Sequence, residues 1–243
     1  MTQHELSVGN GTAVVEWRPL GYDARYFAWQ RNIGRFGALA HWHRFAPYLR
    51  DTDTVLDFGC GGGYLLAALP GARKIGVDVN PAARAEAAAI GIPDVHERVA
   101  EVAAESVDAV ISNSTLEHTD YPLGELCELR RVLKPGGRIV FSVPHESWTW
   151  AYRSGDINQH LHTWSPMCLG NLFTRAGFAV HSVEAEREAW PPYRIGEWVL
   201  RLGGARSFRI VCRVCNRLRV RLARIRPFYV RAHLFIVATK PGL

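Results

Sequence analysis

The stretch from Val55 to Leu66, VLDFGCGGGYLL, places an acid in an apolar run and four glycines soon after it. A strand, a glycine-rich turn and a helix direct backbone N–H groups toward a ligand, a geometry that nucleotide cofactors use. The dinucleotide fingerprint G-x-G-x-x-G starts at Gly59 and Gly61, but Tyr64 occupies its third glycine position. Asp57 would also face a pyrophosphate at unfavourable Coulomb energy. The turn therefore favours a ligand that carries positive charge.

A second acid, Asp78, ends the apolar run IGVD about 20 residues past the turn. An acid at this position accepts hydrogen bonds from a ribose diol. S-adenosylmethionine joins a ribose to an amino group and a sulfonium and carries no phosphate, so both acids suit it. We predict that this cofactor binds at the turn, with a nicotinamide dinucleotide as the alternative.

Four blocks of the chain, taken in order and spacing, resemble the class I S-adenosylmethionine-dependent methyltransferases. They are VLDFGCGGG, IGVDVN, VDAVISNSTLEH and LRRVLKPGGRIVFSVP, and the resemblance covers roughly residues 54 to 185. It implies a Rossmann-like α/β fold, with a doubly wound, seven-stranded, mostly parallel sheet whose last strand is antiparallel. The cofactor would lie beyond the carboxyl ends of the strands.

The same resemblance implies which residues contact the cofactor. They are Asp57, Phe58, Gly59, Cys60 and Gly61 in the turn, Asp78 and Val79 after the second strand, and Asn113 at the end of the fourth. The turn would pack against the methionine end of the cofactor, and Asn113 would lie close to it. Asp78 would hold the ribose and Val79 would flank the adenine. The alternative is a plain tight turn, with Asp78 as a helix cap.

Methyl transfer to a hydroxyl requires alignment of the acceptor and removal of its proton. Histidine suits this role because its pKa is near neutral, and His118, His145 and His162 follow predicted strands or lie in loops. His162-Thr163-Trp164 is similar to an element of ubiquinone-type O-methyltransferases, which act on ring hydroxyls. We predict O-methylation of a small-molecule or lipid-linked acceptor, with His162, or else His145, as the base and His118 as a further candidate. The alternative is that these histidines only satisfy backbone groups.

The segment from 145 to 164 combines histidines with four aromatic residues: Trp148, Trp150, Tyr152 and Trp164. We expect it to form one wall of the acceptor pocket, although aromatic side chains packed under a lid would give the same pattern. His160 and His162 share a face in an extended chain, with Asp156 nearby. No further ligand follows at a suitable spacing, so no metal site is predicted.

The elements that position these residues alternate between short apolar runs and helical stretches, which implies a parallel sheet. Strands are expected at 54–58, 74–79, 95–99, 107–113, 138–143, 178–185 and 233–240. Asn80 before Pro81, and Ser165 before Pro166, are typical of helix starts. Aromatic residues at helical spacing predict an N-terminal helical cap over residues 1–50, followed by the methyltransferase domain over 51–243.

An arginine-rich insertion at about 190–231 precedes the last strand. Residues 194 to 231 hold eleven Arg, no Lys and one Glu, whereas the formal net charge of all 243 residues is only +6. Apolar residues at 208, 211, 215, 218, 222 and 225 predict an amphipathic helix. Two interpretations of this helix are open. In the first, its apolar stripe packs on the core and its arginine face is solvated. In the second, residues 206–226 contact an anionic membrane surface or a lipid-linked substrate. Nucleic acid is not expected, because no aromatic residues interleave with the arginines between 209 and 226.

The cysteine count and the lengths of the apolar runs narrow the classes of protein to which the chain can belong. The five cysteines contain one C-x-x-C and no second pair, so we expect reduced thiols. Without an apolar run of 18 residues or a signal-like start, the chain is expected in the cytoplasm, peripheral to the inner face of the membrane if the basic helix binds lipid. N- or C-methylation, and a non-catalytic cofactor-binding or partner-docking protein, are the alternative functions. The oligomeric state is not predicted.

Overall fold

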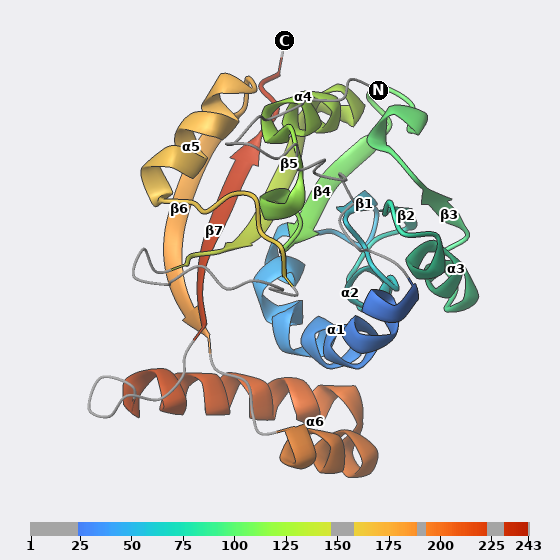
Figure 1. The fold of residues 1–243 in the computed structure, drawn as a ribbon, viewed down its shortest axis with the longest axis vertical. Helices are drawn as coiled ribbons and strands as arrows, with labels where there is room; N and C mark the ends of the chain where they lie inside the picture. The colour runs from blue at the N-terminus through green and yellow to red at the C-terminus, as the bar shows by residue number, and fades with distance from the viewer. Residues whose placement is uncertain (1–23, 147–157, 189–192, 223–230, 243) are drawn as a thin grey trace, which may run out of the picture.

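A seven-stranded sheet of order β3-β2-β1-β4-β5-β7-β6 forms the centre of the computed structural model, which describes residues 24–146, 158–188, 193–222 and 231–242 (Figure 1). The strands are β1 (Thr54–Phe58), β2 (Arg73–Val77), β3 (Asp94–His96), β4 (Val107–Asn113), β5 (Leu133–Pro144), β6 (Ala179–Glu188) and β7 (Arg231–Thr239). Strands β1 to β5 are parallel, and β7 is antiparallel to both β5 and β6. The predicted fold class, with its antiparallel last strand, is confirmed.

Helices cover both faces of this sheet. They are α1 (Ala24–Phe45), α2 (Tyr64–Ala68), α3 (Pro81–Ala89), α4 (Pro122–Val132), α5 (Pro166–Arg175) and α6 (Tyr193–Leu222), with short 3-10 helices η1 (Ala46–Tyr48), η2 (Val99–Glu101) and η3 (Leu116–His118). Two predicted caps are present. The Asn80 side chain accepts a hydrogen bond from the Ala82 N–H at 2.9 Å, and the Ser165 hydroxyl accepts one from the Cys168 N–H at 3.1 Å.

The core lies in two layers, because successive side chains of a strand point to opposite faces. Leu56 and Val110 pack toward α4 and α5, in one cluster with Phe141 and Phe173. Their chain neighbours, such as Val55 and Ile111, pack toward α1 and α2 with Phe45 and Leu66. Burial on both faces explains why the central strands read as continuous apolar runs.

Several element bounds differ from those expected. The described part of the N-terminal region holds one long α-helix and a 3-10 turn. Strand β3 stops at His96, and β5 begins at Leu133, which pairs with Val107 ahead of a register shift. The Lys134-Pro135-Gly136-Gly137 run therefore lies within a strand and not before it, because Leu133 pairs with Val107 before the run and Arg138 pairs with Ala109 after it. Gly136 and Gly137 exchange backbone hydrogen bonds with Lys240.

Helix α6 departs most from the expected pattern. Gly204 has φ 67° and ψ −174°, which breaks the helix into two arms. Phe208 and Cys212 are buried against Phe36 and Ala40 of α1, but Leu218 and Leu222, which we expected on the buried stripe, are about half exposed. The stripe fails there because α1 covers only the beginning of the second arm.

The strand that carries the glycine turn is anchored at its other end by a buried acid. The carboxylate of Asp53, 4% exposed, accepts hydrogen bonds from the Arg50 N–H and the guanidinium of Arg138 on β5. Arg138 Nε has no hydrogen-bond partner among the described residues, and Asp53 is the carboxylate that forms an ion pair with this guanidinium. The pair fixes the start of β1 against β5, two strands away.

We predict that Asp53→Ala lowers the free energy of unfolding by about 3 kcal/mol, because removal of one partner leaves the other charge largely buried and unpaired. Chemical denaturation followed by circular dichroism measures this change. Asp51→Ala, two residues away on the exposed turn, is the matched control and should change stability by less than about 0.5 kcal/mol. Equal stabilities of the two variants would contradict the anchoring role.

Candidate functional site

The glycine turn is held by the end of the neighbouring strand. The N–H groups of Gly59 and Cys60 donate to the carbonyl of Val77 at 2.8 and 3.0 Å. The N–H of Gly61 donates to the carboxylate of Asp78 at 2.8 Å. Gly59 and Gly61 have φ of 73° and 53°, a left-handed conformation that favours glycine. Residues of β2 therefore fix the turn before any ligand binds.

The two glycines serve different purposes. A Cβ at Gly59 would lie 2.1 Å from Oγ1 of Thr115, so only glycine lets the loop after β4 pack on the turn. A Cβ at Gly61 would meet no heavy atom within 4 Å. The backbone at Gly61 therefore borders open space, which a ligand can enter.

Two acids flank that space: Asp57 is 3% exposed, and Asp78 is partly buried. Burial, with a smaller effect from the charge of Asp78, raises the pKa of Asp57 from 3.8 to about 8. Burial also raises the pKa of Asp78, although hydrogen bonds from the Asn80 and Gly61 backbone and the charge of Arg84 oppose this rise. Asp57 is therefore largely protonated at neutral pH, and a cationic ligand would favour its ionised form.

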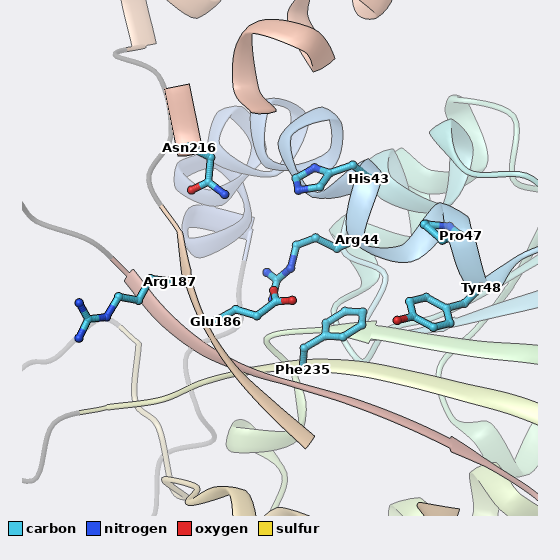
Figure 2. Close-up of a pocket in the computed structure, with 8 residues that line it drawn as sticks. All are labelled: His43, Arg44, Pro47, Tyr48, Glu186, Arg187, Asn216 and Phe235. Atoms are coloured by element: carbon cyan, nitrogen blue, oxygen red, sulfur yellow. The ribbon is translucent and has the colours of Figure 1, made fainter. Parts of the chain in front are cut away.

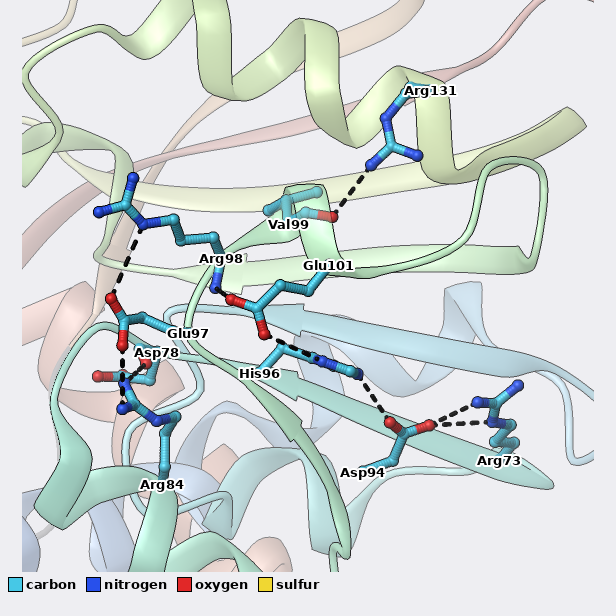
Figure 3. A network of polar contacts seen from close by, with 10 residues as sticks. All are labelled: Arg73, Asp78, Arg84, Asp94, His96, Glu97, Arg98, Val99, Glu101 and Arg131. Carbon is cyan, nitrogen blue, oxygen red and sulfur yellow. Dashed lines mark hydrogen bonds and ion pairs between the residues drawn. The ribbon is translucent and has the colours of Figure 1, made fainter.

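A polar network secures the end of β2 (Figure 3). Arg84 donates to the carbonyls of Asp78 and Val79 at 2.8 and 2.9 Å, and to the carboxylate of Glu97 at 3.2 Å. The network continues through Arg98 toward edge strand β3. With its backbone fixed, Val79 leaves its side chain 64% exposed, an apolar surface beside the turn.

The other predicted cofactor residues differ in whether their side chains can reach a ligand. Phe58 stacks on Phe141, and a Cβ at Gly76 would lie 2.8 Å from the Cys60 sulfur. The side chains of Phe58 and Cys60 thus pack in the interior, and their backbones alone border the turn. By contrast, Oδ1 of Asn113 is buried and has no hydrogen-bond partner among the described residues, so it can accept one from a ligand.

These features fit S-adenosylmethionine. Its positive charge would favour ionisation of Asp57, and its amino group could donate to the orphaned oxygen of Asn113. Its adenine could rest on exposed Val79. Both oxygens of Asp78 already accept backbone hydrogen bonds, from Gly61 and Asn80, and the carboxylate retains lone pairs for a ribose.

The predicted histidines His118, His145 and His162 come together with His160 beyond the ends of β4 and β5. These four residues are called the histidine cluster below. The carbonyl of Glu117 in η3 accepts hydrogen bonds from the N–H groups of Leu161 and His162 at 2.9 and 3.1 Å. This pairing brings the segment after residue 157 against the loop after β4. His145 follows β5 and reaches the same segment through its side chain, which bonds the carbonyl of Trp164 at 3.0 Å.

The hydrogen bonds of two histidines define their tautomers. Nε2 of His162 lies 2.9 Å from the carbonyl of Thr119, and Nδ1 of His145 bonds the carbonyl of Trp164. A carbonyl only accepts, so these nitrogens carry the protons. In the neutral rings, Nδ1 of His162 and Nε2 of His145 therefore keep a lone pair. His162 also stacks on Trp164, with ring centroids 5.4 Å apart.

Glu117 is a site residue that the sequence analysis missed. Its carboxyl is fully buried, both oxygens lack hydrogen-bond partners among the described residues, and one lies 3.8 Å from Nε2 of His118. Burial, with a smaller contribution from the charge of Glu146, raises the pKa of Glu117 from 4.5 to about 8. The sequence signal was an acid between a leucine and a histidine in the loop after β4, and this pattern alone does not reveal that the acid is buried.

Glu117, His118 and His160 also lie close enough to share a ligand. Their candidate ligand atoms are within 4.8 Å of one another, and the two imidazole centroids are 4.7 Å apart. Nδ1 of His160 pairs with Glu146 at 2.7 Å. A carboxylate and two imidazoles are donor types that divalent cations accept. The sequence analysis assigned no metal ligands, because Glu117 and His160 come from distant parts of the chain.

The expected aromatic wall is only partly described. Trp148, Trp150, Tyr152 and Asp156 lie outside the described residues. Trp164 is 6% exposed and packs in the core cluster with Phe141 and Phe173. Trp164 thus stacks on the His162 ring and offers little exposed surface to an acceptor.

A separate cavity of about 360 Å³ lies between the end of α1, strands β6 and β7, and α6 (Figure 2). Arg44 and Glu186 form an ion pair at 2.7 Å across it, and the Arg44 guanidinium lies 5.1 Å from the ring centroid of Phe235. None of the predicted cofactor or catalytic residues lines this cavity. It is therefore distinct from the glycine turn and the histidine cluster.

Comparisons with known proteins agree with this geometry. The family described as "Methyltransferase domain" matches residues 30–183, more than half of the chain. A curated relative, the ubiquinone biosynthesis O-methyltransferase of Nitrosococcus oceani, is 37% identical over 99 residues, which cover 36% of this chain and 42% of that protein. The chain thus spans about two fifths of the length of the ubiquinone biosynthesis O-methyltransferases that it matches.

Solved structures resemble the whole fold. The methyltransferase bound to the Haloferax volcanii Trm112 activator has a TM-score of 0.62 at 22% identity, covering 89% of this chain and 98% of that one. A Haemonchus contortus phosphoethanolamine N-methyltransferase, solved with S-adenosylhomocysteine, has a TM-score of 0.59 at 19% identity, covering 89% of this chain and 57% of that one. The chain belongs to the methyltransferase domain family, the class I S-adenosylmethionine-dependent methyltransferases.

Proposed function

We propose that this protein transfers the methyl group of S-adenosylmethionine to a hydroxyl oxygen of a small-molecule or lipid-linked acceptor. The observation that carries the proposal is the position of the histidine cluster. Thr115 packs on Gly59, and Glu117 and His118 follow it within three residues. Groups able to accept a proton therefore adjoin the turn where the cofactor is expected.

The choice of oxygen draws on the relatives. Several curated proteins that match about two fifths of this chain are named ubiquinone biosynthesis O-methyltransferases. A structural neighbour is an N-methyltransferase, so the fold alone accommodates either acceptor atom. A nitrogen acceptor would not require a cluster of bases, because a neutral amine attacks without prior loss of a proton. The buried acid and the histidines favour a hydroxyl.

S-adenosylmethionine would supply a methyl group activated by its sulfonium. Within the protein, ionised Asp57 would balance the positive charge and the backbone from Gly59 to Gly61 would hold the methionine end. Asn113 would accept a hydrogen bond from the amino group. Nδ1 of His162, or else Nε2 of His145, would take the hydroxyl proton. Glu117, whose pKa burial raises to about 8, can give or take a proton near neutral pH.

We predict that affinity for S-adenosylhomocysteine, which keeps the amino group, rises as pH increases from 6 to 7.5. At pH values below the Asp57 pKa of about 8, the buried Asp57 carboxyl is protonated, and a bound ammonium group favours its ionised form. Binding therefore releases a proton, and the dissociation constant falls by up to about tenfold per pH unit. Isothermal titration at each pH measures the slope.

Asp57→Asn keeps the shape of the side chain but cannot ionise, so its affinity should be nearly independent of pH over this range. The Asp51→Asn variant, altered on the exposed turn before β1, serves as the control and should keep the slope of the unaltered protein. A slope that survives in Asp57→Asn would show that another group releases the proton.

We predict that His162→Ala lowers the rate of methyl transfer by about a hundredfold or more, because general-base catalysis contributes about 10²–10⁴. Affinity for S-adenosylhomocysteine should stay unchanged. Transfer of labelled methyl groups to a panel of ring-hydroxylated acceptors, with and without a prenyl chain, measures the rate. His145→Ala is tested in parallel, because His145 is the alternative base.

His181 on β6 is exposed, and its side chain hydrogen-bonds Thr239 at the end of β7. This end of β7 lies away from the histidine cluster. His181→Ala is therefore a matched control and should leave the rate unchanged. If neither His162→Ala nor His145→Ala changes the rate, the assignment of a histidine base fails.

Acid–base catalysis without a metal also predicts that turnover survives dialysis against a chelator.

A further inference from the structure

The second arm of α6 exposes a face that no described element covers. Within 205–222, Phe208 and Cys212 face α1, and the Arg209 guanidinium lies 4.3 Å from the ring centroid of Trp42. The opposite side carries large apolar side chains in the open: Ile210 at 62%, Val214 at 49%, Leu218 at 53% and Leu222 at 48% exposure. The described α6 thus has two apolar faces, one packed on the protein and one exposed.

The exposed residues form two adjacent rows. Ile210, Val214, Leu218 and Leu222 recur every four residues, so they lie along one side of the helix. Arg213, Arg217 and Arg221 recur at the same step, shifted by one residue, and are all exposed. Arg206 extends the arginine row toward the break at Gly204. A row of aliphatic side chains and a row of guanidinium groups therefore run side by side.

The charge of this helix is not balanced locally. Helix α6 holds eight arginines and one glutamate. Within the described part of the chain, none of the ion pairs involves an arginine of α6. A strongly positive field therefore surrounds an exposed apolar row, and a partner that satisfies both must be anionic and apolar.

We propose that this face of α6 binds the surface of an anionic lipid bilayer. Helices that lie on membranes bury apolar side chains at the acyl boundary, while flanking basic side chains reach the anionic headgroups. Arginine suits the second role, since its apolar stem lies along the helix while its guanidinium extends to phosphate. None of the described helices is long and apolar enough to span the bilayer, so α6 would lie on its surface.

The first arm of α6 extends the same chemistry. Ile195 is 51% exposed, Trp198 64% and Leu202 70%, at steps of three and four residues. Tryptophan is favoured at membrane interfaces, because its ring is apolar and its N–H remains hydrogen-bonded. A nucleic acid would explain the arginines, but it would leave seven exposed aliphatic and aromatic side chains of α6 without a role.

The fold places α6 at the edge where the cofactor turn and histidine cluster lie. Strand β6 ends at Glu188 and β7 begins at Arg231, and these residues pair beyond His233, which pairs with Pro144 at the end of β5. Helix α6 connects the two strands there (Figure 1). A bilayer bound by α6 would thus lie at the same edge of the sheet as the proposed acceptor site. This placement deepens the proposed action on a lipid-linked acceptor, although bilayer binding itself requires no methyl transfer.

Sedimentation with vesicles tests the inference on the full chain. Vesicles of phosphatidylcholine mixed with phosphatidylglycerol should sediment the protein, and vesicles of phosphatidylcholine alone should bind it at least about tenfold more weakly. Binding to the anionic vesicles should weaken as salt is raised, because ions screen the arginines. The assay needs neither cofactor nor acceptor, so it can succeed or fail independently of the methyltransferase proposal.

Two triple variants separate the contributions of the rows. Arg213→Gln, Arg217→Gln and Arg221→Gln together should weaken binding to anionic vesicles by roughly a hundredfold, from about fivefold per arginine. Ile210→Gln, Val214→Gln and Leu218→Gln together should weaken it by about tenfold or more, because the apolar area that the helix can bury in the bilayer falls. All six positions are exposed, so both variants should keep the circular dichroism spectrum of the unaltered protein.

Matched controls lie on elements other than α6. Arg175→Gln removes an exposed arginine at the end of α5, and Ile90→Gln removes a 38% exposed isoleucine after α3. Both should bind vesicles as the unaltered protein does. Equal binding to neutral and anionic vesicles, or full binding by the arginine triple variant, would overturn the proposal. So would binding of single-stranded RNA that the arginine variant loses, in the absence of vesicle binding.

Discussion

The contact between Thr115 and Gly59 is the constraint on which the site depends. The parallel strands β1 and β4 end at the same edge, and their following loops must share one small volume. Because Gly59 lacks a side chain, Thr115 packs directly on the turn. That contact sets the distance between the cofactor turn and the residues that follow Thr115. The hydrogen bonds that the Glu117 carbonyl accepts from the N–H groups of Leu161 and His162 then position the far side of the site.

The site contains two buried carboxyl groups that are held in a neutral form. Burial raises the pKa of both Asp57 and Glu117 to about 8, one beside the turn and one within the histidine cluster. As pH rises from about 4 to 8, these groups would ionise in the unfolded chain before they ionise in the folded one. The ligand-free protein therefore loses stability over that range. Such an arrangement is typical of sites in which a ligand supplies the missing charge.

Much of the fold could be predicted because its signals are local. The bounds of β1 and β4 are those of the expected strands, 54–58 and 107–113, since each is a short apolar run. The caps at Asn80 and Ser165 needed only neighbouring residues. Glu117 could not be identified in this way, because its pKa depends on burial by segments distant in sequence. The early start of β5 was missed for the same reason, because it depends on the pairing of Leu133 with Val107 of β4, ahead of the Pro-Gly-Gly run.

The position of α6 in the chain has a consequence for how this fold can diversify. Strands β6 and β7 are antiparallel neighbours, and such strands can be joined by a turn of two residues. The sheet itself therefore does not need the long connection that contains α6. A small cluster of Phe36, Ala40, Phe208 and Cys212, together with the contact of Arg209 with the Trp42 ring, packs the second arm on α1. Evolution can therefore lengthen, exchange or recharge this connection while the strand register and the cofactor turn stay the same.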